Sequence, residues 1–332
     1  MSRIPLEHRL RAAWQRRGPL AVVLWPLSRL YGALAARERA AYSSGARTVT
    51  RLPVPVVVVG NVVAGGAGKT PTTLAIVQHL KARGWRPGIV SRGHGRASSD
   101  CREVGPGADP QDVGDEPLLL RRRADVPVFV APRRAEAGRA LLAAHPACDI
   151  LVCDDGLQHV ALARDVEVCV FDARGTGNGW LLPAGPLREP WPRAVDLVLF
   201  TETPSANGGA GQPAPTSAGQ HPPTFTATRR LADDALRADG SRVPLAELQG
   251  QPLSAVAGIA RPEAFFAMLR AAGLTLARTQ ALPDHYDFNS WQRPPDKRET
   301  LICTEKDALK LWRHDPAALA VPLVLDVPAA FF

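Results

Sequence analysis

Apolar residues along the middle of the chain follow two alternating patterns. Short continuous runs, such as the four valines at 56–59, are typical of strands that are buried on both faces of a sheet. Between such runs, apolar residues recur at helical spacing, as Leu74, Val77 and Leu80 do before Gly84 ends the segment. Further strands are expected at 88–91, 126–130, 150–153, 166–171 and 197–200, with a further helix at 134–144. The alternation predicts an α/β core with a mainly parallel sheet over residues 48–202.

The pattern changes after residue 202. Residues 203–223 are rich in Gly, Pro, Ser and Ala and are predicted to form a flexible insertion, because they cannot bury enough apolar surface to order themselves. Residues 224–332 return to alternating runs and are predicted to form a smaller C-terminal α/β domain. Strands are expected there at 225–228, 254–259, 301–304 and 323–327, with a helix at 262–272 that begins with proline and is followed by glycine.

Residues 1–47 are predicted to form a basic N-terminal helical arm. The 332-residue chain carries a formal net charge of +8, and the arm holds +7 of it through nine arginines and two glutamates. Its apolar part, residues 18–27, is about half the ~20 residues of a membrane-spanning helix and contains Pro26, so the arm is not expected to span a bilayer. Trp14, Trp25 and Tyr31 among the arginines are typical of an amphipathic segment in the lipid headgroup layer. A basic helix packed on the following domain explains the same composition, and the residues alone leave both alternatives open.

Composition argues against several other classes of protein. A content of 45% hydrophobic and 22% charged residues is typical of a folded protein and not of a disordered one. The five cysteines form no C-x-x-C pair, which favours reduced thiols over a disulfide scaffold or a zinc site. Nucleic-acid binding is disfavoured, since stacking aromatics are sparse in the arm and no recognised binding motif follows it.

The stretch GNVVAGGAGKT, residues 60–70, joins a predicted strand to a predicted helix and predicts a phosphate-binding loop. Lys69 is expected to reach the β and γ phosphates of a nucleotide, and the Thr70 hydroxyl is expected to bind magnesium. Val63 stands where the usual pattern G-x-x-x-x-G-K-[ST] has its first glycine, yet the strand before the loop and the helix after it still favour a nucleotide site. The backbone amides expected to converge on phosphate oxygens are those of Gly65, Gly66, Ala67 and Gly68.

A pair of aspartates, Asp154 and Asp155, follows the predicted strand at 150–153. Because a phosphate loop needs an acidic partner at the end of a neighbouring strand, the pair is a candidate magnesium site. A strand-end turn capped by aspartate is the alternative. Gln158 and His159 are placed either to contact the ligand or to orient the carboxylates, and a purely structural histidine suits the same position.

Three classes of protein carry a phosphate loop of this kind: kinases, GTPases, and motor or partition ATPases. Residues 304–307 read TEKD, in which the lysine is one place too late for the N-K-x-D motif that reads guanine. The near-neutral core lacks the extended basic surface expected of a nucleic-acid ATPase. A kinase needs a proton acceptor for the attacking hydroxyl, and Asp115 and His285 are candidates for a base and its partner. The same residues also suit an acidic first helical turn and a solvated loop histidine.

Eight short motifs occur in a fixed order along the chain. They read GNVVAGGAGKTPTT, SRGHGR, VGDEP, DDGLQH, GPLREP, AGIARPEAFF, DHYDF and TEKDALKL. In this order they resemble the tetraacyldisaccharide 4'-kinase family of lipid A biosynthesis, over nearly the whole chain apart from the insertion. The resemblance implies a P-loop NTPase core that uses ATP and Mg2+ to phosphorylate the 4'-hydroxyl of an acylated glucosamine disaccharide 1-phosphate, forming lipid IVA. That family also lacks the first glycine of the loop, so Val63 agrees with it.

The resemblance also implies roles for individual residues. Asp115 would be the base, made effective by His285, and Lys69 and Asp155 would complete the catalytic set. It further implies a peripheral or monotopic protein at the cytoplasmic face of the bacterial inner membrane, in contact with the lipid surface, without nucleic acid and without an obligate protein partner. The departures are His94, where tyrosine is common, and the long insertion. The metal ligands would be Thr70, Asp154, Asp155 and Glu189, and the substrate candidates are Asn61, Arg92, Arg134, Gln158 and His159.

Overall fold

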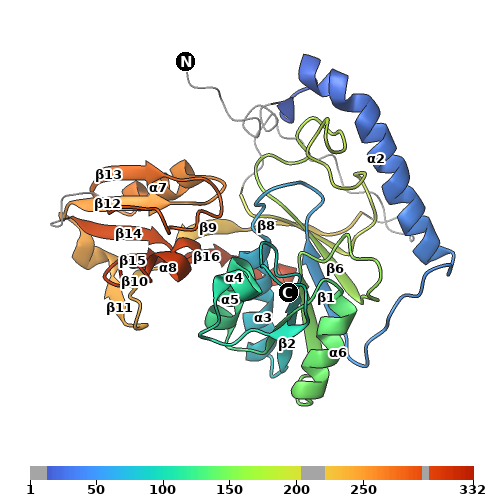
Figure 1. The fold of residues 1–332 in the computed structure, drawn as a ribbon, viewed down its shortest axis with the longest axis horizontal. Helices are drawn as coiled ribbons and strands as arrows, with labels where there is room; N and C mark the ends of the chain where they lie inside the picture. The colour runs from blue at the N-terminus through green and yellow to red at the C-terminus, as the bar shows by residue number, and fades with distance from the viewer. Residues whose placement is uncertain (1–12, 203–220, 294–298) are drawn as a thin grey trace.

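Eight strands form the larger sheet of the computed structural model, which describes residues 13–202, 221–293 and 299–332 (Figure 1). The strand order is β3-β4-β2-β5-β1-β6-β7-β8, and neighbouring strands are parallel except for the edge pair of β3 and β4. In the central strand β1, Val58 and Val59 belong to core clusters on opposite faces, as the two-residue period of a strand predicts. The strands are β1 (Val56–Gly60), β2 (Pro87–Ser91), β3 (Arg102–Glu103), β4 (Val128–Val130), β5 (Ile150–Asp154), β6 (Val166–Phe171), β7 (Leu197–Phe200) and β8 (Thr224–Thr226).

Helices cover both faces of this sheet. On one face, α3 (Lys69–Ala82) and α5 (Asp115–Ala124) pack together, and Leu74 and Leu118 join Val59 in one cluster. On the other face, Leu141 of α6 (Arg134–Ala144) packs in the cluster of Val58, while the short helix α4 (Pro110–Val113) precedes α5. Because the carboxyl ends of parallel strands meet at one edge, the loop after β1 and the end of β5 lie side by side.

A second α/β unit contains a six-stranded sheet in the order β11-β10-β15-β14-β12-β13. On one face α7 (Pro262–Ala271) packs through Phe266, and on the other α8 (Glu305–Leu311) packs through Leu311. We call this unit the C-terminal lobe and the eight-stranded unit the core lobe. The remaining elements of the C-terminal lobe are β10 (Asp234–Leu236), β11 (Arg242–Pro244), η1 (Leu245–Leu248), β12 (Leu253–Ala257), β13 (Leu276–Ala281), β14 (Thr300–Thr304) and β15 (Leu319–Val321).

An antiparallel two-stranded ribbon joins the lobes. Strand β9 (Thr228–Leu231) follows β8 and pairs with β16 (Leu323–Asp326), which follows β15. After β16, the turn η2 (Ala329–Phe331) returns to the core lobe, where Phe331 packs in the cluster of Val59. The lobes are therefore connected through two chain segments. The domain boundary predicted at residue 224 stays a prediction, while β8 just after it extends the core sheet.

The N-terminal arm contains a 25-residue helix, α2 (Pro19–Ser43), which lies along the side of the core lobe (Figure 1). Ser28 Oγ donates a hydrogen bond to Leu181 O over 2.8 Å, and the Tyr31 hydroxyl donates to Arg188 O over 2.7 Å. These contacts fix one side of α2 on the loop between β6 and β7. The other side exposes large apolar side chains, namely Leu20, Val22, Val23, Trp25, Leu27, Leu30 and Leu34.

The expectation that Pro26 interrupts the apolar segment is wrong, because α2 continues through it to Ser43. A proline removes one backbone hydrogen bond of a helix, but the alanine-rich sequence that follows has high helix propensity and the helix resumes. By length and apolar composition alone, α2 is sufficient to cross a bilayer, and no other helix in the described ranges is. The expectation that the apolar part of the arm is too short to span a bilayer is therefore also wrong. Residues 1–12 of the predicted arm lie outside the described residues.

Most of the predicted elements are confirmed. The ranges 166–171, 197–200 and 134–144 coincide with β6, β7 and α6. The expected strand at 225–228 is divided, because Ala227 is buried in the core between β8 and β9. The short or exposed strands β3, β10, β11, β13 and β15 were not predicted. Residues 203–220 of the predicted insertion lie outside the described residues.

Candidate active site

The loop between β1 and α3 has the backbone geometry of a phosphate-binding loop. Gly65 and Gly68 have φ angles of +100° and +92°, in the left-handed region that favours glycine. A Cβ atom added at Gly68 would lie 2.8 Å from Thr201 Cγ2, so a side chain there would also clash. Helix α3 begins at Lys69, and the free amides of its first turn form the positive end of the helix dipole. The loop and this helix end together suit the phosphates of a nucleotide.

Val63 lies outside this cradle. Its side chain is 3% exposed and packs in the core cluster on the α6 side of the sheet. Its backbone forms an isolated antiparallel bridge with Leu187. The position of the usual first glycine is therefore used for packing, while Gly65 and Gly68 supply the backbone conformations that the loop requires.

Two aspartates at the end of β5 lie next to this loop. Asp154 Oδ1 accepts a hydrogen bond from Thr73 Oγ1 over 2.8 Å, and burial, with the nearby charges of Glu116 and Asp155, raises the pKa of Asp154 to about 7. Asp155 Oδ1 lies 3.8 Å from Lys69 Nζ and accepts a hydrogen bond from Arg188 Nη1 over 3.0 Å. Burial alone would raise the pKa of Asp155, but these two cations lower it below its usual range.

The second oxygen of Asp154 favours a cation at this place. Asp154 Oδ2 is buried and has no hydrogen-bond partner among the described residues. Such an oxygen is costly to bury unless a proton or a metal ion satisfies it. The described ranges contain no group of three or more His, Cys, Asp or Glu side chains that could hold a metal ion alone. Magnesium at nucleotide sites takes one or two carboxylates with phosphate oxygens and water, so Asp154, Asp155 and Thr70 fit that ion.

Glu189, the further predicted metal ligand, is buried beside positive and amide groups. Gln158 Nε2 donates to Glu189 Oε1 over 2.7 Å, and Arg39 Nη1 of α2 lies 3.6 Å from Glu189 Oε2. Gln158 Nε2 is also 2.9 Å from Asn61 O, and Asn61 Nδ2 donates to Gly65 O over 3.4 Å. Gln158 and Asn61 therefore connect Glu189 with the phosphate loop. The metal-binding role of Glu189 stays a prediction.

Arg134 contacts the backbone of Asp155, and His159 in turn contacts Arg134. Arg134 Nη2 donates to Asp155 O over 2.9 Å, and Arg134 N donates to His159 Nε2 over 3.3 Å. Burial and the charges of Arg134 and Arg164 lower the pKa of His159 to about 4, so its ring is neutral near pH 7. These contacts give both residues a positioning task at Asp155. Arg92, another substrate candidate, is exposed and lines the same cleft.

The candidates Asp115 and His285 meet across the two lobes. His285 Nδ1 lies 3.1 Å from Asp115 Oδ2. Asp115, at the start of α5, is 7% exposed, whereas His285, in the loop after β13, is 38% exposed. Lys310 Nζ donates to the same Asp115 oxygen over 2.7 Å. Burial alone would raise the pKa of Asp115, but the hydrogen bonds from His285 and Lys310 lower it below its usual range. The predicted contact is present, and the catalytic roles stay predictions.

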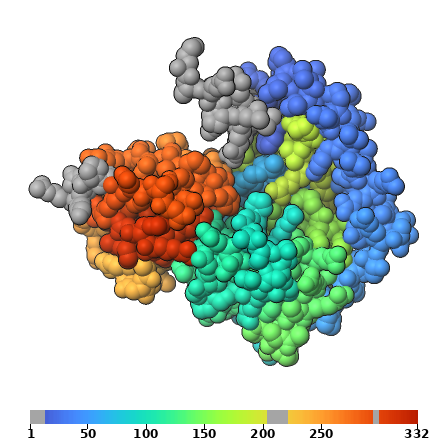
Figure 2. All heavy atoms as spheres, in the orientation of Figure 1, coloured from blue at the N-terminus to red at the C-terminus, as the bar shows by residue number. Residues whose placement is uncertain are grey.

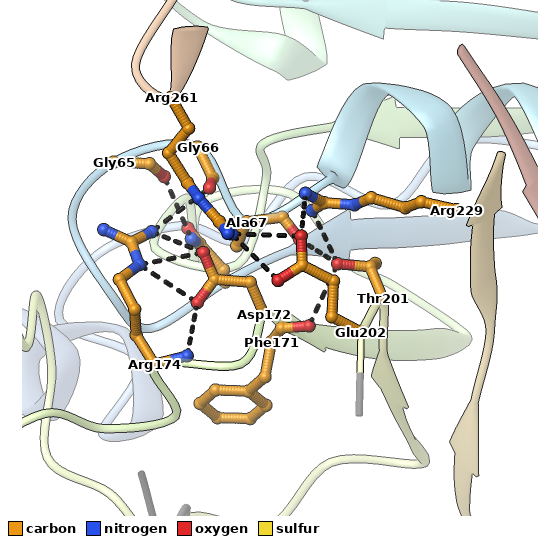
Figure 3. A network of polar contacts seen from close by, with 11 residues as sticks. Gly65, Gly66, Ala67, Phe171, Asp172, Arg174, Thr201, Glu202, Arg229 and Arg261 are labelled. Atoms are coloured by element: carbon orange, nitrogen blue, oxygen red, sulfur yellow. Dashed lines mark hydrogen bonds and ion pairs between the residues drawn. The ribbon is translucent and has the colours of Figure 1, made fainter. Parts of the chain in front are cut away.

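A network of arginines and carboxylates holds the phosphate loop from the side of β7 (Figure 3). Thr201 Oγ1 donates to Ala67 O over 3.0 Å and accepts from Arg229 Nη2 over 2.7 Å. Glu202 accepts from Arg229 Nη1 over 2.6 Å and from Arg261 Nη1 over 2.8 Å. Because Arg229 lies in the ribbon and Arg261 in the C-terminal lobe, Glu202 connects the core lobe with both.

A second part of this network holds the loop from the side of β6 (Figure 3). Arg174 Nε donates to the buried carboxylate of Asp172 over 2.8 Å, and Arg174 Nη2 donates to Gly66 O over 3.1 Å. Two carbonyl groups of the phosphate loop, those of Gly66 and Ala67, are thus satisfied by side chains. These contacts involve carbonyl groups, so they leave the loop amides available to a phosphate.

Part of this site lines one cleft of about 1410 Å³ between the lobes, seen as the hollow beside the orange lobe in Figure 2. The phosphate loop and Asp155 line it from the core lobe, and His285 and Lys306 line it from the C-terminal lobe. Tyr31 of α2 also reaches the cleft. Typical small-molecule pockets enclose ~300–1,000 Å³, so this cleft has room for a nucleotide and a second substrate.

Several charged residues at the site were not predicted to act there. Arg188 lies within GPLREP, and Lys306 and Lys310 lie within TEKDALKL, so their motifs were visible although their contacts were not. Glu202 lies two residues after the end of β7 and belongs to no recognised motif. An acidic or basic residue directly after a buried parallel strand is the one signal that could have found it.

Comparison with known proteins identifies the family. A family model described as Tetraacyldisaccharide-1-P 4'-kinase matches residues 20–331. The chain belongs to this family. A tetraacyldisaccharide 4'-kinase from Acidovorax sp. strain JS42 is 64% identical over 328 residues, which cover 99% of this chain and 93% of that protein. One from Verminephrobacter eiseniae strain EF01-2 is 57% identical over 334 residues, covering 99% of this chain and 75% of that protein.

Comparison with solved structures agrees with this family assignment. A crystal structure of LpxK from Aquifex aeolicus in complex with ATP has a TM-score of 0.79 and 27% sequence identity, and the match covers 93% of this chain and 96% of that one. The family resemblance and the α/β fold are therefore confirmed. Members of the tetraacyldisaccharide 4'-kinase family are ATP-dependent kinases of lipid A biosynthesis, a pathway that implies a lipid disaccharide substrate and membrane association. The alternatives of a GTPase or a motor ATPase are set aside.

Proposed function

We propose that the chain transfers the γ-phosphoryl group of ATP to the 4'-hydroxyl of a tetraacylated glucosamine disaccharide 1-phosphate. The observation that carries the proposal is the shared cleft, in which the phosphate loop faces His285, the hydrogen-bonded partner of Asp115. Phosphoryl transfer requires a phosphate cradle, charge neutralisation and a group that accepts the hydroxyl proton. Family membership supports the choice of acceptor.

The core lobe would supply charge neutralisation. Lys69 and the amides of the phosphate loop are proposed to hold the β and γ phosphates. Arg188 is held on the same side by its 3.0 Å hydrogen bond to Asp155. Magnesium, when bound, would offset the phosphate charge, held by Thr70, Asp154 and Asp155, with Glu189 as a further candidate ligand.

The Asp115–His285 pair would accept the proton. As the 4'-oxygen attacks, its bond to the γ-phosphorus forms, the bond from that phosphorus to the β–γ bridging oxygen breaks, and ADP leaves. The hydroxyl proton passes to the pair, with Asp115 as the base and His285 as the partner that faces the cleft. Because one hydrogen bond joins the two groups, the proton is assigned to the pair.

The five substrate candidates divide by their contacts. Arg92 and Arg134 are cations on the cleft and are proposed to contact anionic groups of the sugar substrate. Asn61, Gln158 and His159 contact the phosphate loop or its neighbours, so we propose that they position those groups.

We further propose that the protein works at the cytoplasmic face of the inner membrane with α2 in the lipid surface. Val23 is 74% exposed, and Leu34 and other apolar side chains lie on the same exposed side of α2. Arginines of the arm would pair with anionic lipid head groups. Tyr31 of α2 also lines the cleft, so a lipid-associated helix would hold the cleft next to an acylated substrate.

Phosphoryl transfer from ATP to the disaccharide precursor in mixed micelles tests the proposal. Asp115→Asn should lower kcat by about 10²–10⁴-fold, the usual worth of a positioned acid or base, with little change in ATP affinity. Asp125→Asn is the matched control, since Asp125 is an exposed residue at the other end of α5. Nucleotide hydrolysis without a lipid product would exclude the proposed reaction. Wild-type turnover by Asp115→Asn would exclude Asp115 as the base.

A further inference from the structure

Two lysines on one side of α8 contact the Asp115–His285 pair. Lys306 and Lys310 are four residues apart, so their side chains lie one above the other along the helix. Lys310 Nζ is 2.7 Å from Asp115 Oδ2, and Lys306 Nζ is 3.2 Å from His285 Nε2. Each member of the pair is therefore contacted by a different lysine of the same helix.

The Lys310 ammonium group has its three donors occupied. It donates to Asp115 Oδ2, and it lies 3.3 Å from Tyr286 O and 3.4 Å from His285 O. An ammonium group carries three N–H donors, so none is left for a substrate. Lys310 is also mostly buried. These contacts suit a residue that holds Asp115 and the His285 loop together.

The Lys306 contact decides which ring nitrogen of His285 carries hydrogen. A lysine ammonium group can only donate, so His285 Nε2 accepts from Lys306. A neutral ring then carries its hydrogen on Nδ1, which donates to Asp115 Oδ2 over 3.1 Å. The second oxygen, Asp115 Oδ1, accepts no hydrogen bond from any described residue. In the proposed reaction, it is the oxygen that would accept a hydrogen bond from the substrate hydroxyl.

Helix α8 is itself anchored to the loop that carries His285. Thr304 caps the helix by accepting from Asp307 N, and Asp307 Oδ2 accepts from Gly258 N over 3.0 Å. Gly258 O in turn accepts from His285 N over 3.1 Å, which supports the left-handed backbone of His285, with φ of 63°. The two lysines and the histidine are thus held on one rigid frame.

We propose that Lys306 and Lys310 are positioning residues for the phosphoryl transfer, with Lys310 holding the Asp115 carboxylate and Lys306 holding the tautomer of His285. The inference rests on the proposed function, in which the pair accepts the hydroxyl proton. A carboxylate held in one orientation by two donors presents its remaining oxygen to the substrate without reorganisation. A fixed tautomer also prevents the ring from donating Nε2–H in place of Nδ1–H.

Another ion pair in the same interface serves as a control for a purely structural role of the lysines. Arg123, in the last turn of α5, and Glu305 of α8 form an ion pair with a distance of 2.5 Å, whereas Lys310 of α8 meets Asp115 at the start of α5. Both pairs connect the same two helices across the lobes. The Arg123–Glu305 pair does not contact His285, so its loss changes lobe contact without changing the Asp115–His285 pair.

The expected pH effect has a definite sign. Loss of a cation beside Asp115 raises the pKa of the pair, and the acid limb of kcat/KM then moves to higher pH because the base protonates earlier. An opposite charge at this distance is worth about one to three pH units, and we expect about one for a group that keeps its histidine partner. The other charged or titratable groups that face the pair are Lys306 of α8, Asp284 of the His285 loop, Glu116 of α5 and His94 of the loop after β2.

The test measures transfer from ATP to the disaccharide precursor in mixed micelles from pH 5 to 9. Lys310→Met should move the acid limb up by about one pH unit, with the KM for ATP within about twofold. Lys310→Arg, which keeps the charge, should move the limb back towards that of the wild type. Arg123→Met should leave the limb in place. An unshifted limb in Lys310→Met, or an equal shift in Arg123→Met, would overturn the inference.

A separate measurement tests the role of Lys306. Lys306→Met should lower kcat by about tenfold, and in protein labelled with 15N-histidine it should change the ring-nitrogen shifts of His285. Unchanged ring-nitrogen shifts would overturn the assignment for Lys306. ATP affinity by calorimetry confirms that each variant is folded. If the wild type makes no lipid product, the proposed function itself is wrong. If the wild type makes the product and Asp115→Asn does not, an unchanged pH profile of Lys310→Met would exclude only the role proposed for the lysines.

Discussion

Changing Val63 to glycine would restore the usual phosphate-loop pattern, and we expect it to destabilise the protein. Val63 is 3% exposed and bridges Leu187, so its side chain contributes packing and its backbone is held in place. Full burial of a valine side chain is worth ~1.5–3 kcal/mol, and glycine in a regular segment costs a further ~0.5–1 kcal/mol. Val63→Gly should therefore lower the free energy of unfolding by about 2–4 kcal/mol.

Thermal unfolding and calorimetric ATP titration measure the two halves of this prediction. For a domain the size of the core lobe, 1 kcal/mol shifts the melting temperature by about 2–4 °C, so a fall of roughly 5–15 °C is expected. Val63→Ala, which keeps the backbone restriction, should show the packing loss without the glycine cost. ATP affinity below the transition should stay within about twofold, because Gly65 and Gly68 form the cradle. Wild-type melting, or several-fold tighter ATP binding by Val63→Gly, would refute the reasoning.

Three further predictions concern the loop and the arm. Gly68→Ala should weaken ATP binding at least about tenfold in calorimetry, since φ is +92° and Thr201 blocks the added atom, whereas Gly84→Ala, with φ of +85° in open space, should not. Thr201→Val should raise the KM for ATP about 2–12-fold, the worth of one hydrogen bond; an unchanged KM would show that the Ala67 contact does not position the loop. Val23→Glu should reduce sedimentation with anionic vesicles while ATP affinity is kept, and full sedimentation would contradict a lipid-facing α2.

The buried strands of the core sheet were predictable because their patterns are local. The runs of β6 and β7 are apolar and bounded by polar residues, and both strands have the expected limits. Strands β10, β11 and β15 have three residues each, too few for a period to appear in the sequence. The prediction at Pro26 was wrong for a different reason, because the helix propensity of the whole segment outweighed the energetic cost of one proline.

The candidate site was predictable in its residues and less so in its contacts. The phosphate loop and the strand-end aspartates follow from chain order, because both lie at the carboxyl edge of adjacent parallel strands. Asp115 and His285 are 170 positions apart, so only their residue types and the family resemblance suggested the pair. Lys310 reaches Asp115 only after the lobes pack, and Arg188 reaches Asp155 from a distant loop of the core lobe. No local sequence pattern indicates which carboxylate either side chain contacts.

The cations of the cleft divide into two kinds by what holds them. Lys69 lies 3.8 Å from Asp155, too far for a direct hydrogen bond, and is free to turn to a phosphate if another cation takes its place at Asp155. In the proposed reaction, a magnesium ion bound with ATP would offer that exchange, and the buried aspartates would then keep a positive partner. Lys310 has three acceptors within hydrogen-bond distance and nothing to exchange for. On the proposed mechanism, the core lobe would carry the charge that moves with the nucleotide, and the C-terminal lobe would carry the charge that stays beside Asp115.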